Sequence, residues 1–331
     1  MGKYKLINNV LGWIVFAIAS TVYLMTMEPT ASFWDCGEFI SSAYKLEVGH
    51  PPGAPFFMLT ANLFTQLASD PSTVAKMVNT MSALFSGLTI LFLFWSITHL
   101  ARKIMVKDGE EASLGQMITV MGSGLVGALA YTFSDTFWFS AVEGEVYAYS
   151  SLFTAVVFWL ILKWEAVADK PHADRWIVLI AYLMGLSIGV HLLNLLCIPA
   201  IVLVYYYKKF PNPTMKGTLV ALLASFAIVA LMMYGVVQGL VEVCGYFELL
   251  FVNVLGMPYN SGVFAYVIIV AGVLIWSIWE TMRDEIHPTR MKIAFILSVV
   301  LIGIPFIGSG YVLAVILTAA LSLYLFKSKK V

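Results

Sequence analysis

Long apolar runs recur along almost the whole chain and constrain its fold more than any other feature. Runs of roughly 17–25 residues can cross about 30 Å of hydrocarbon as helices that rise 1.5 Å per residue. Of the 331 residues, 60% are hydrophobic and only 11% are charged, whereas about a quarter of the residues in soluble domains are charged. The runs do not alternate as the strands of an outer-membrane barrel do. The sequence therefore predicts an all-α polytopic membrane protein with one transmembrane domain over residues 1–331.

About ten crossings are expected. The run 176–207 is too long for one crossing and is interrupted near Gly189, so we interpret it as two short helices joined by a tight turn. The last two crossings meet similarly at Gly308. The first run has no small-residue cleavage site, so we expect a retained helix. The predicted crossings are residues 8–27, 74–99, 114–133, 149–165, 176–190, 192–207, 217–240, 262–282, 292–308 and 311–326.

The positions of the lysine and arginine residues indicate which ends of these helices face the cytoplasm. If the N-terminus is inside, all but two of the 19 basic residues fall in cytoplasmic segments, and the exceptions are Lys45 and Lys76. The positive-inside rule asks for such a bias, so we expect both termini in the cytoplasm. The outer loops are then about residues 28–73, 134–148 and 241–261, and the outward-facing acids are concentrated in the first two.

The first outer loop carries two acids in the sequence FWDCGEF. On a helix, Asp35 and Glu38 share a face because they are three residues apart. Desolvation near an apolar boundary raises the pKa of a carboxyl group, which suits a general base. Ser32 and Asp35 also resemble a capping box, in which Asp35 only caps a helix over 33–47. Simple solvation of both acids near the headgroups is a third explanation.

A proline-rich turn, GHPPG at 49–53, ends this helix. It presents His50 rigidly, or His50 is only a turn residue. The apolar segment 54–68 is too short to cross and indicates an interfacial helix. Asp70 and the two residues after it are expected to cap the next crossing.

The second outer loop contains Glu143 and Glu145 among aromatic residues. Two residues apart, they cannot share a helix face but can do so in an extended loop. A solvated loop with an interfacial aromatic belt explains the same residues without a function. His191 and Asn194, at the tip of the short helix pair, form a polar pair at membrane depth. Hydrogen bonding between helices is the alternative explanation for that pair.

The three cysteines, Cys36, Cys197 and Cys244, lack metal-ligand spacing. Cys36 and Cys244 can pair on the outer face, or all three are buried free thiols. The chain contains no Walker loop, GxGxxG, HExxH or serine elbow. A soluble nucleotide-sugar would be in the cytoplasm, whereas the acids of the outer loops face outward. An outward-facing site for sugar transfer therefore needs a sugar donor that is already in the membrane, and a lipid-linked sugar meets that need. We expect membrane lipid as a partner, and no nucleic acid.

Four segments carry a resemblance to a known family: FWDCGEFI at 33–40, VGHPPGAP at 48–55, FWFSAVEGEVY at 137–147 and GLSIGVHLLN at 185–194. They resemble signatures of the bacterial membrane proteins grouped as domain of unknown function 2723, over about residues 8–260. That family is similar to transmembrane protein O-mannosyltransferases and, more broadly, to GT-C glycosyltransferases.

The resemblance implies a GT-C-type glycosyltransferase in a bacterial inner membrane. Such an enzyme moves a sugar, expected to be mannose, from polyprenyl phosphate to a Ser or Thr hydroxyl of a secreted or membrane protein on the periplasmic side. It implies Asp35 as the catalytic base, with Glu38 as the next candidate. The expected substrate-binding residues are Trp34, Lys45, His50, Trp138, Glu143, Glu145, His191 and Asn194. Among these, His191, His50 or Lys45 balances the leaving phosphate, and the tryptophans, with Phe33 and Phe137, stack on the sugar.

Two alternatives stay open. A metal-dependent lipid-linked oligosaccharide transferase would hold a divalent cation with Asp35, Glu38, Glu143 or Glu145; otherwise we expect no cofactor. A non-enzymatic flippase or transporter would place charged residues inside its helices along a pathway. The predicted crossings contain few such residues.

Overall fold

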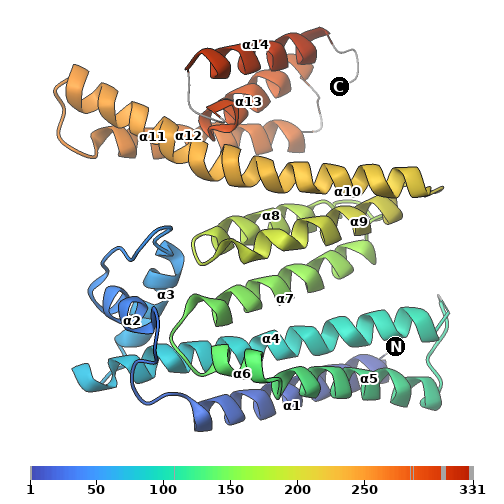
Figure 1. Cartoon of the computed structure of the whole chain (residues 1–331). Coiled ribbons are helices and arrows are strands. Elements are labelled where there is room, and N and C mark those ends of the chain that lie inside the picture. The colour runs from blue at the N-terminus through green and yellow to red at the C-terminus, as the bar shows by residue number, and fades with distance from the viewer. Residues whose placement is uncertain (1, 108, 284, 286, 307–310, 328–331) are drawn as a thin grey trace. The chain divides into compact units, whose positions relative to one another are not determined.

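The computed structural model describes residues 2–107, 109–283, 285, 287–306 and 311–327, and every regular element within these ranges is helical (Figure 1). The chain divides into two compact units, Met1–Leu222 and Leu223–Val331, which we describe separately. The prediction of one transmembrane domain over the whole chain stays a prediction. The all-α polytopic class is confirmed.

Seven helical stretches in the described part of the chain are long and apolar enough to cross a membrane. Three of the ten predicted crossings fall instead in shorter helices of 14, 14 and 17 residues: α8 (Arg175–Ile188), α13 (Pro288–Leu301) and α14 (Tyr311–Lys327). The predicted turn at Gly308 lies outside the described residues. The seven stretches are Gly2–Thr26, Pro71–Met105, Leu114–Thr132, Val146–Glu165, Leu192–Lys209, Met215–Val254 and Ser261–Met282.

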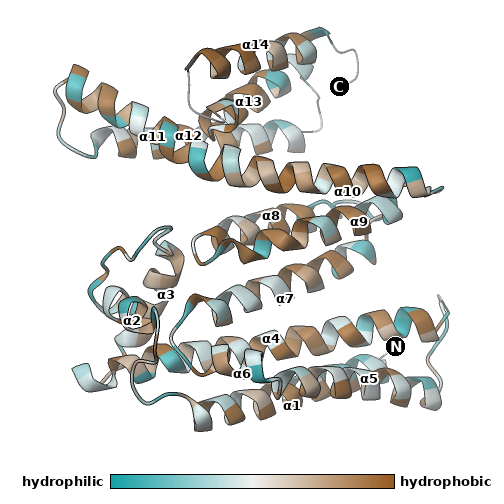
Figure 2. Cartoon of the chain, in the orientation of Figure 1, coloured by the Kyte–Doolittle hydropathy of each residue, from teal (hydrophilic) through white to brown (hydrophobic). Residues whose placement is uncertain are grey.

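Unit 1 is a bundle organised around one long helix, α4. This helix packs against α1, α5 and α7, and α7 in turn contacts α8 and α9 (Figure 1). The hydrophobic residues lie along these helices and the hydrophilic ones gather in the loops and at the helix ends (Figure 2). The bundle helices, apart from α8, are α1 (Gly2–Thr26), α4 (Val74–Met105), α5 (Leu114–Thr132), α7 (Val146–Glu165) and α9 (Ile198–Lys209).

Helices α1 and α4 approach each other closely at Gly87. A Cβ atom at this position would lie 2.0 Å from the Oγ atom of Ser20. Small residues allow helix backbones to come together in a membrane, where packing rather than the hydrophobic effect drives association. This contact fixes the first helix against α4 and so determines where the following outer loop begins.

Two short helices cover one end of this bundle. Helix α2 spans Cys36–Lys45 and α3 spans Pro55–Thr65. Phe39 and Phe57 from these helices pack into a core with Val78 of α4. The helix predicted over 33–47 starts later, at Cys36. The helix predicted over 54–68 is confirmed, with tighter limits. Asp70 caps the next helix as predicted, because its side chain accepts from the Ser72 amide at 2.8 Å.

The tight turn predicted near Gly189 is also confirmed. Helix α8 ends at Ile188, and a short 3₁₀ segment, Leu192–Cys197, leads into α9. The tip of this hairpin reaches the end of the bundle that α3 covers, since the Gly189 carbonyl accepts from the Phe56 and Phe57 amides at 2.6 and 3.2 Å. The hairpin tip therefore holds α3, in the predicted first outer loop, by two backbone hydrogen bonds.

The opposite end of unit 1 is basic. The Arg102 guanidinium lies 4.8 Å from the centre of the Tyr4 ring, Lys103 pairs with Glu165, and Lys209 donates to the Ala168 carbonyl at 2.8 Å. These contacts bring the ends of α1, α4, α7 and α9 together. Unit 1 thus has one acidic and one basic end, the polarity that the positive-inside rule predicts for its crossings.

Unit 2 contains the end of a long continuous helical run and three further helices. The run Met215–Val254 includes α10 (Met215–Ala230), α11 (Gln238–Leu249) and two π-helical stretches. The outer loop predicted over 241–261 is therefore helical as far as residue 254. No proline interrupts the sequence between Pro213 and Pro258, so nothing stops the helix there. Helix α12 (Ser261–Met282) follows and packs on α11 and α13.

Candidate active site

An exposed group of three ionisable side chains lies at the start of α2. The backbone amide of His50 donates to Oε1 of Glu38 at 2.5 Å, and His50 Nδ1 lies 3.0 Å from Glu38 Oε2. The other ring nitrogen, Nε2, lies 3.9 Å from Oδ2 of Asp35. Each residue offers one possible ligand atom within 4.8 Å of the others. We call Asp35, Glu38 and His50 the exposed triad.

Asp35 occupies the N-cap position of α2, but its side chain makes no capping hydrogen bond. The interpretation that Asp35 only caps the helix is therefore wrong. Its side chain is 58% exposed, and its one ionic neighbour among the described residues is His50. Asp35 is thus a carboxylate that is held in place by the backbone and remains accessible to solvent.

Glu38 and His50 shift each other's protonation. Hydrogen bonds from the His50 amide and then from its ring lower the pKa of Glu38. The hydrogen bond to Glu38 and the negative charges of Glu38, Asp35 and Glu145 raise the pKa of His50, against an opposing effect of burial. Glu38 is therefore an ionised partner that favours the imidazolium form of His50.

The backbone around the triad is tightly constrained. A Cβ atom at Gly49 would lie 3.3 Å from Glu38 Oε1 and 3.2 Å from Met58 Cε, so a side chain there would push against the carboxylate. Trp34 adopts a left-handed conformation with φ of 63°, and 89% of its surface is exposed. Such a conformation costs roughly 1–2 kcal/mol for a residue other than glycine. It ends the extended chain just before α2 and turns the Trp34 ring into solvent.

A second, buried group lies directly behind the exposed triad. The Cys36 thiol donates to Oε1 of Glu145 at 3.6 Å, and ligand atoms of Cys36, Glu143 and Glu145 lie within 4.8 Å of one another. Only 4% of Glu143 and 7% of Glu145 is exposed. The prediction of a solvated loop is therefore wrong. The two acids lie between α6 (Asp135–Ala141) and α7, where the chain is not helical.

Burial changes the protonation of this second group, which we call the buried triad. Desolvation raises the pKa of Glu143, and hydrogen bonding from Ser32 and Cys36 opposes the change. Desolvation and then the charge of Glu143 raise the pKa of Glu145. Desolvation and then the two carboxylates raise the pKa of the Cys36 thiol, which stays protonated. The site therefore combines the Glu38 carboxylate at the surface, whose pKa is lowered, with two acids beneath it, Glu143 and Glu145, whose pKa values are raised.

Asn79 of α4 connects both outer loops, and the sequence reasoning missed it. Its side chain is fully buried, and its amide nitrogen donates to the carbonyls of Glu28 at 2.7 Å and Thr30 at 3.0 Å. A Cβ atom at Gly144 would lie only 2.9 Å from Asn79 Oδ1. A lone asparagine inside an apolar crossing is the signal that could have identified it.

His191 flanks the site, whereas Asn194 lies in the core. The ring centres of His191 and Tyr147 are 5.4 Å apart, and His191 Nδ1 accepts from the Leu193 amide at 3.1 Å. Burial lowers the pKa of His191, so this ring is neutral and can donate only through Nε2. Asn194 is fully buried and donates to Ser187 Oγ at 2.9 Å, which matches the alternative of hydrogen bonding within the helix pair.

Two other predicted residues lie outside the cluster. The Trp138 indole nitrogen donates to Thr26 Oγ1 at 2.9 Å, and its ring packs against Tyr23 in the core around α1. It is held as a packing residue rather than presented to a sugar, and Phe137 beside it is buried. Lys45 lies at the far end of α2, about 15 Å along the helix from Asp35.

The three cysteines are free, and Cys36 and Cys197 are buried. The expectation of buried free thiols is therefore confirmed for Cys36 and Cys197, whereas Cys244 is only partly buried. Sequence reasoning considered Cys36 as a disulfide partner or a buried thiol and missed its contact with Glu145.

Comparisons with known proteins identify the same part of the chain. The family model described as the protein O-mannosyl-transferase TMEM260 N-terminal domain matches residues 35–214. The protein O-mannosyl-transferase TMEM260 of Mus musculus is 28% identical over 174 residues, which cover 53% of this chain and 22% of that protein. The Dictyostelium discoideum protein of the same name is 25% identical over 187 residues, covering 55% and 21%.

No solved structure matches the chain. The chain spans only about a fifth of the length of these curated relatives. The family match begins at Asp35, includes both triads and ends in the loop after α9. Because it covers more than half of the residues, the chain belongs to the family of the protein O-mannosyl-transferase TMEM260 N-terminal domain.

Proposed function

We propose that this chain is a membrane glycosyltransferase of the GT-C type that transfers mannose from a polyprenyl-phosphate donor to a protein Ser or Thr hydroxyl. The observation that carries the proposal is the Asp35 carboxylate, which is exposed, makes no capping bond and lies beside a histidine. Family membership and the relatives' printed name support the reaction class.

In this mechanism Asp35 accepts the proton of the acceptor hydroxyl as the oxygen attacks the anomeric carbon of the sugar. The bond between that carbon and the phosphate oxygen breaks, and polyprenyl phosphate leaves with the bonding electrons. This single displacement inverts the configuration. A free carboxylate within hydrogen-bond reach of the hydroxyl is what a general base requires.

The neighbouring residues have supporting roles. His50, which Glu38 favours in its charged form, balances the developing charge on the leaving phosphate. Trp34 offers an exposed ring to the sugar face, and His191 donates from its Nε2 atom. Glu143 and Glu145 hold the segment around Asp35 from behind rather than touching substrate, because they are buried.

We place the protein in the inner membrane of a bacterium, with both termini in the cytoplasm and the acidic end of unit 1 in the periplasm. The charge polarity of unit 1 supports this orientation. The donor then enters from the outer leaflet, and the acceptor is a secreted or membrane protein.

The test is transfer of labelled mannose from polyprenyl-phosphate mannose to a Ser- and Thr-rich acceptor by the protein in proteoliposomes. Asp35→Asn keeps the side-chain shape and removes the base, so we expect a fall of about a hundredfold or more in transfer. Asp135→Asn is the matched control, because Asp135 lies in the second outer loop outside both triads. Equal transfer by wild type and the Asp35 variant, or a product of retained configuration, would refute the mechanism.

A metal-dependent transferase is the second candidate function. The exposed triad supports it, because a carboxylate oxygen from Asp35 and from Glu38 and a His50 nitrogen lie within 4.8 Å of one another. Carboxylates and imidazole are suitable ligands for several divalent cations, and a bound cation would neutralise the leaving phosphate. A cation would have to displace the hydrogen bond between His50 and Glu38. Loss of transfer in chelator, restored by added Mn²⁺ or Mg²⁺, would favour this function.

A further inference from the structure

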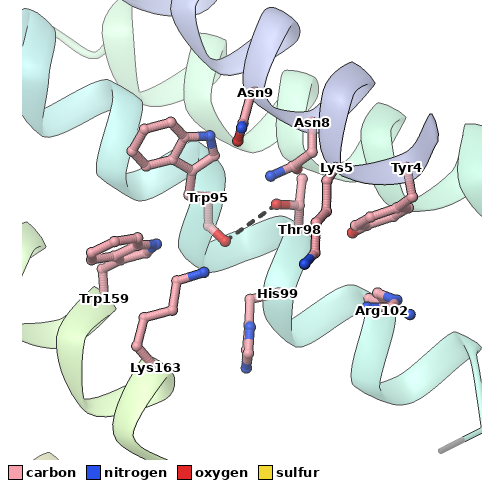
Figure 3. A pocket seen from close by; sticks show the side chains of 10 residues that line it. All are labelled: Tyr4, Lys5, Asn8, Asn9, Trp95, Thr98, His99, Arg102, Trp159 and Lys163. Carbon is pink, nitrogen blue, oxygen red and sulfur yellow. Dashed lines mark hydrogen bonds between the residues drawn. The ribbon is translucent and has the colours of Figure 1, made fainter. Parts of the chain in front are cut away.

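A polar cavity lies at the basic end of unit 1, away from both triads. It has a volume of about 420 Å³ and is formed by α1, α4 and α7 (Figure 3). Asn8 comes from α1, His99 and Arg102 from α4, and Lys163 from α7. None of these residues belongs to the proposed catalytic machinery.

Helix α4 fixes the distance between this cavity and the candidate active site. Asn79, which holds the outer loops, and His99, which lines the cavity, are twenty residues apart on α4. At 1.5 Å per residue they are separated by about 30 Å, the thickness of the hydrocarbon core. If the triads lie at one membrane surface, the cavity lies at the headgroup level of the other.

The cavity is lined by Lys5, Arg102 and Lys163, and no acidic residue lines it. Among the described residues none of these three forms an ion pair with a carboxylate. Arg102 and Lys163 instead lie over aromatic rings, each 4.8 Å from the ring centre of Tyr4 or Trp159 respectively. A cation held by an aromatic face keeps its charge available to an anion.

Two neighbouring lysines at this end of the bundle are paired with carboxylates, unlike the three cations of the cavity. Lys103 pairs with Glu165, and Lys208 pairs with Asp169 at 2.8 Å. Glu165 and Asp169 thus form their ion pairs beside the cavity and do not line it. Three cations that converge on one space repel each other, so an anion between them is stabilising.

The cavity also contains polar groups without partners. His99 Nε2 and Asn8 Oδ1 are buried and form no hydrogen bond. Leaving such groups without a hydrogen-bond partner is unfavourable, because they have lost their contacts with water. An oxyanion accepts a hydrogen bond from a protonated imidazole nitrogen, and a hydroxyl group beside it can donate to the asparagine oxygen.

We propose that this cavity binds a phosphate group, carried either by a lipid headgroup or by free phosphate. Arginine and lysine are the residues that proteins use for phosphate. Basic pockets between transmembrane helices on the cytoplasmic side bind acidic lipid headgroups in other proteins. A phosphate with a glycerol unit would offer an oxyanion to the cations of the cavity and hydroxyl groups to the unpaired Oδ1 of Asn8.

The experiment measures binding of three probes to the purified full chain in detergent, by native mass spectrometry with intrinsic tryptophan fluorescence as a second readout. The probes are dioctanoyl phosphatidylglycerol, dioctanoyl phosphatidylcholine and inorganic phosphate. The variants are Lys5→Met, Lys163→Met and the double substitution, which keep most of each side chain. Lys216→Met is the matched control, because Lys216 is an exposed lysine of unit 1 that does not line the cavity.

We expect each single substitution to weaken binding about fivefold, the factor that corresponds to ~1 kcal/mol per basic residue near an anionic surface. The double variant should lose about 25-fold, and Lys216→Met should bind as wild type does. Variant-sensitive binding of phosphatidylglycerol that inorganic phosphate does not displace identifies a lipid site. Displacement by inorganic phosphate identifies a free-phosphate site.

The proposal is overturned if neither anionic probe binds, or if the double variant binds as tightly as the Lys216 control. Equal binding of phosphatidylcholine and phosphatidylglycerol also overturns it, because the cations would then contribute nothing. Thermal melting of each variant checks that the fold is retained. If Lys163→Met melts early, Lys163→Gln is measured in its place, because it also removes the charge that lies over Trp159.

Discussion

Nδ1 of His50 lies 3.0 Å from Oε2 of Glu38, while the backbone amide of the same histidine donates to Oε1 at 2.5 Å. His50 thus contacts both carboxylate oxygens of Glu38. Both oxygens of Glu38 are engaged by His50, whereas the Asp35 carboxylate makes no capping hydrogen bond and is 58% exposed, which is why we propose Asp35 as the base. Glu38 and Asp35 therefore differ in their hydrogen bonding, although they belong to the same triad.

The pH dependence of transfer should depend on Glu38. The pKa of His50 is raised above its ordinary 6.5, so its charged form persists to higher pH and is lost as the pH rises through the raised value. Glu38→Gln removes the main cause of this shift. We therefore expect the alkaline limb of the pH–rate profile to move to lower pH. Glu47→Gln, an exposed acid in the same loop, should leave the limb in place; an unmoved limb in the Glu38 variant would separate His50 from catalysis.

Stability should depend on pH through Glu145. Its pKa is raised above its ordinary 4.5 in the folded protein, so its contribution to stability is fully present below 4.5 and is lost as the pH rises through the raised value. Glu145→Gln imitates the protonated acid and removes this loss. Melting in detergent should show the variant to be more stable than wild type at pH 8 and equal to it at pH 4. A difference that is the same at both pH values would contradict the prediction.

Two substitutions of Trp34 separate its ring from its backbone. Trp34→Gly removes the ring and relieves the left-handed conformation, whereas Trp34→Ala removes the ring and keeps the strain of roughly 1–2 kcal/mol. We expect both variants to lose transfer to a similar extent, on the order of tenfold if the ring stacks on a sugar. The glycine variant should melt at a higher temperature than the alanine variant. If only the alanine variant loses activity, the backbone rather than the ring is what matters.

Gly144 should tolerate no side chain. A Cβ atom there would lie 2.9 Å from Asn79 Oδ1, 3.0 Å from Val78 and 3.1 Å from Ile40, all inside a packed region. Overpacking of this kind costs about 1–3 kcal/mol, so Gly144→Ala should lower the melting temperature and reduce transfer by displacing the buried triad. Gly122→Ala in α5 is the control, because nothing lies within 4 Å of its added Cβ atom and alanine favours a helix. It should melt at or above the wild-type temperature.

Much of the fold could be predicted because apolar length and charge bias act locally. Five of the six crossings predicted for unit 1, the turn near Gly189 and the cap at Asp70 all follow from such signals. The helix through residue 254 was not predicted, although the segment 241–254 contains two acids, Glu242 and Glu248, but no proline. A pair of isolated acids does not stop a helix, whereas a proline does.

The site was less predictable, because burial is decided by contacts between segments far apart in the sequence. Glu143 and Glu145 are buried by packing against Cys36, more than one hundred residues earlier. Trp138 belongs to the core because its indole nitrogen donates to Thr26 and its ring packs against Tyr23. The spacing of residues in one loop contains no information about either partner.

The contact between Phe56, Phe57 and the Gly189 carbonyl has a consequence for exchanging parts between family members. The first amides of α3 have no partner within their own helix, and the last carbonyls of α8 lack one too. Here each helix end satisfies the other, and a Cβ atom at Gly189 would lie 2.8 Å from Cβ of Phe56. A loop that is grafted from a relative at residues 28–72 must therefore be accompanied by that relative's hairpin tip. Transplanted alone, it would face a different hairpin surface and could lose the acceptor of its Phe56 and Phe57 amides, the Gly189 carbonyl.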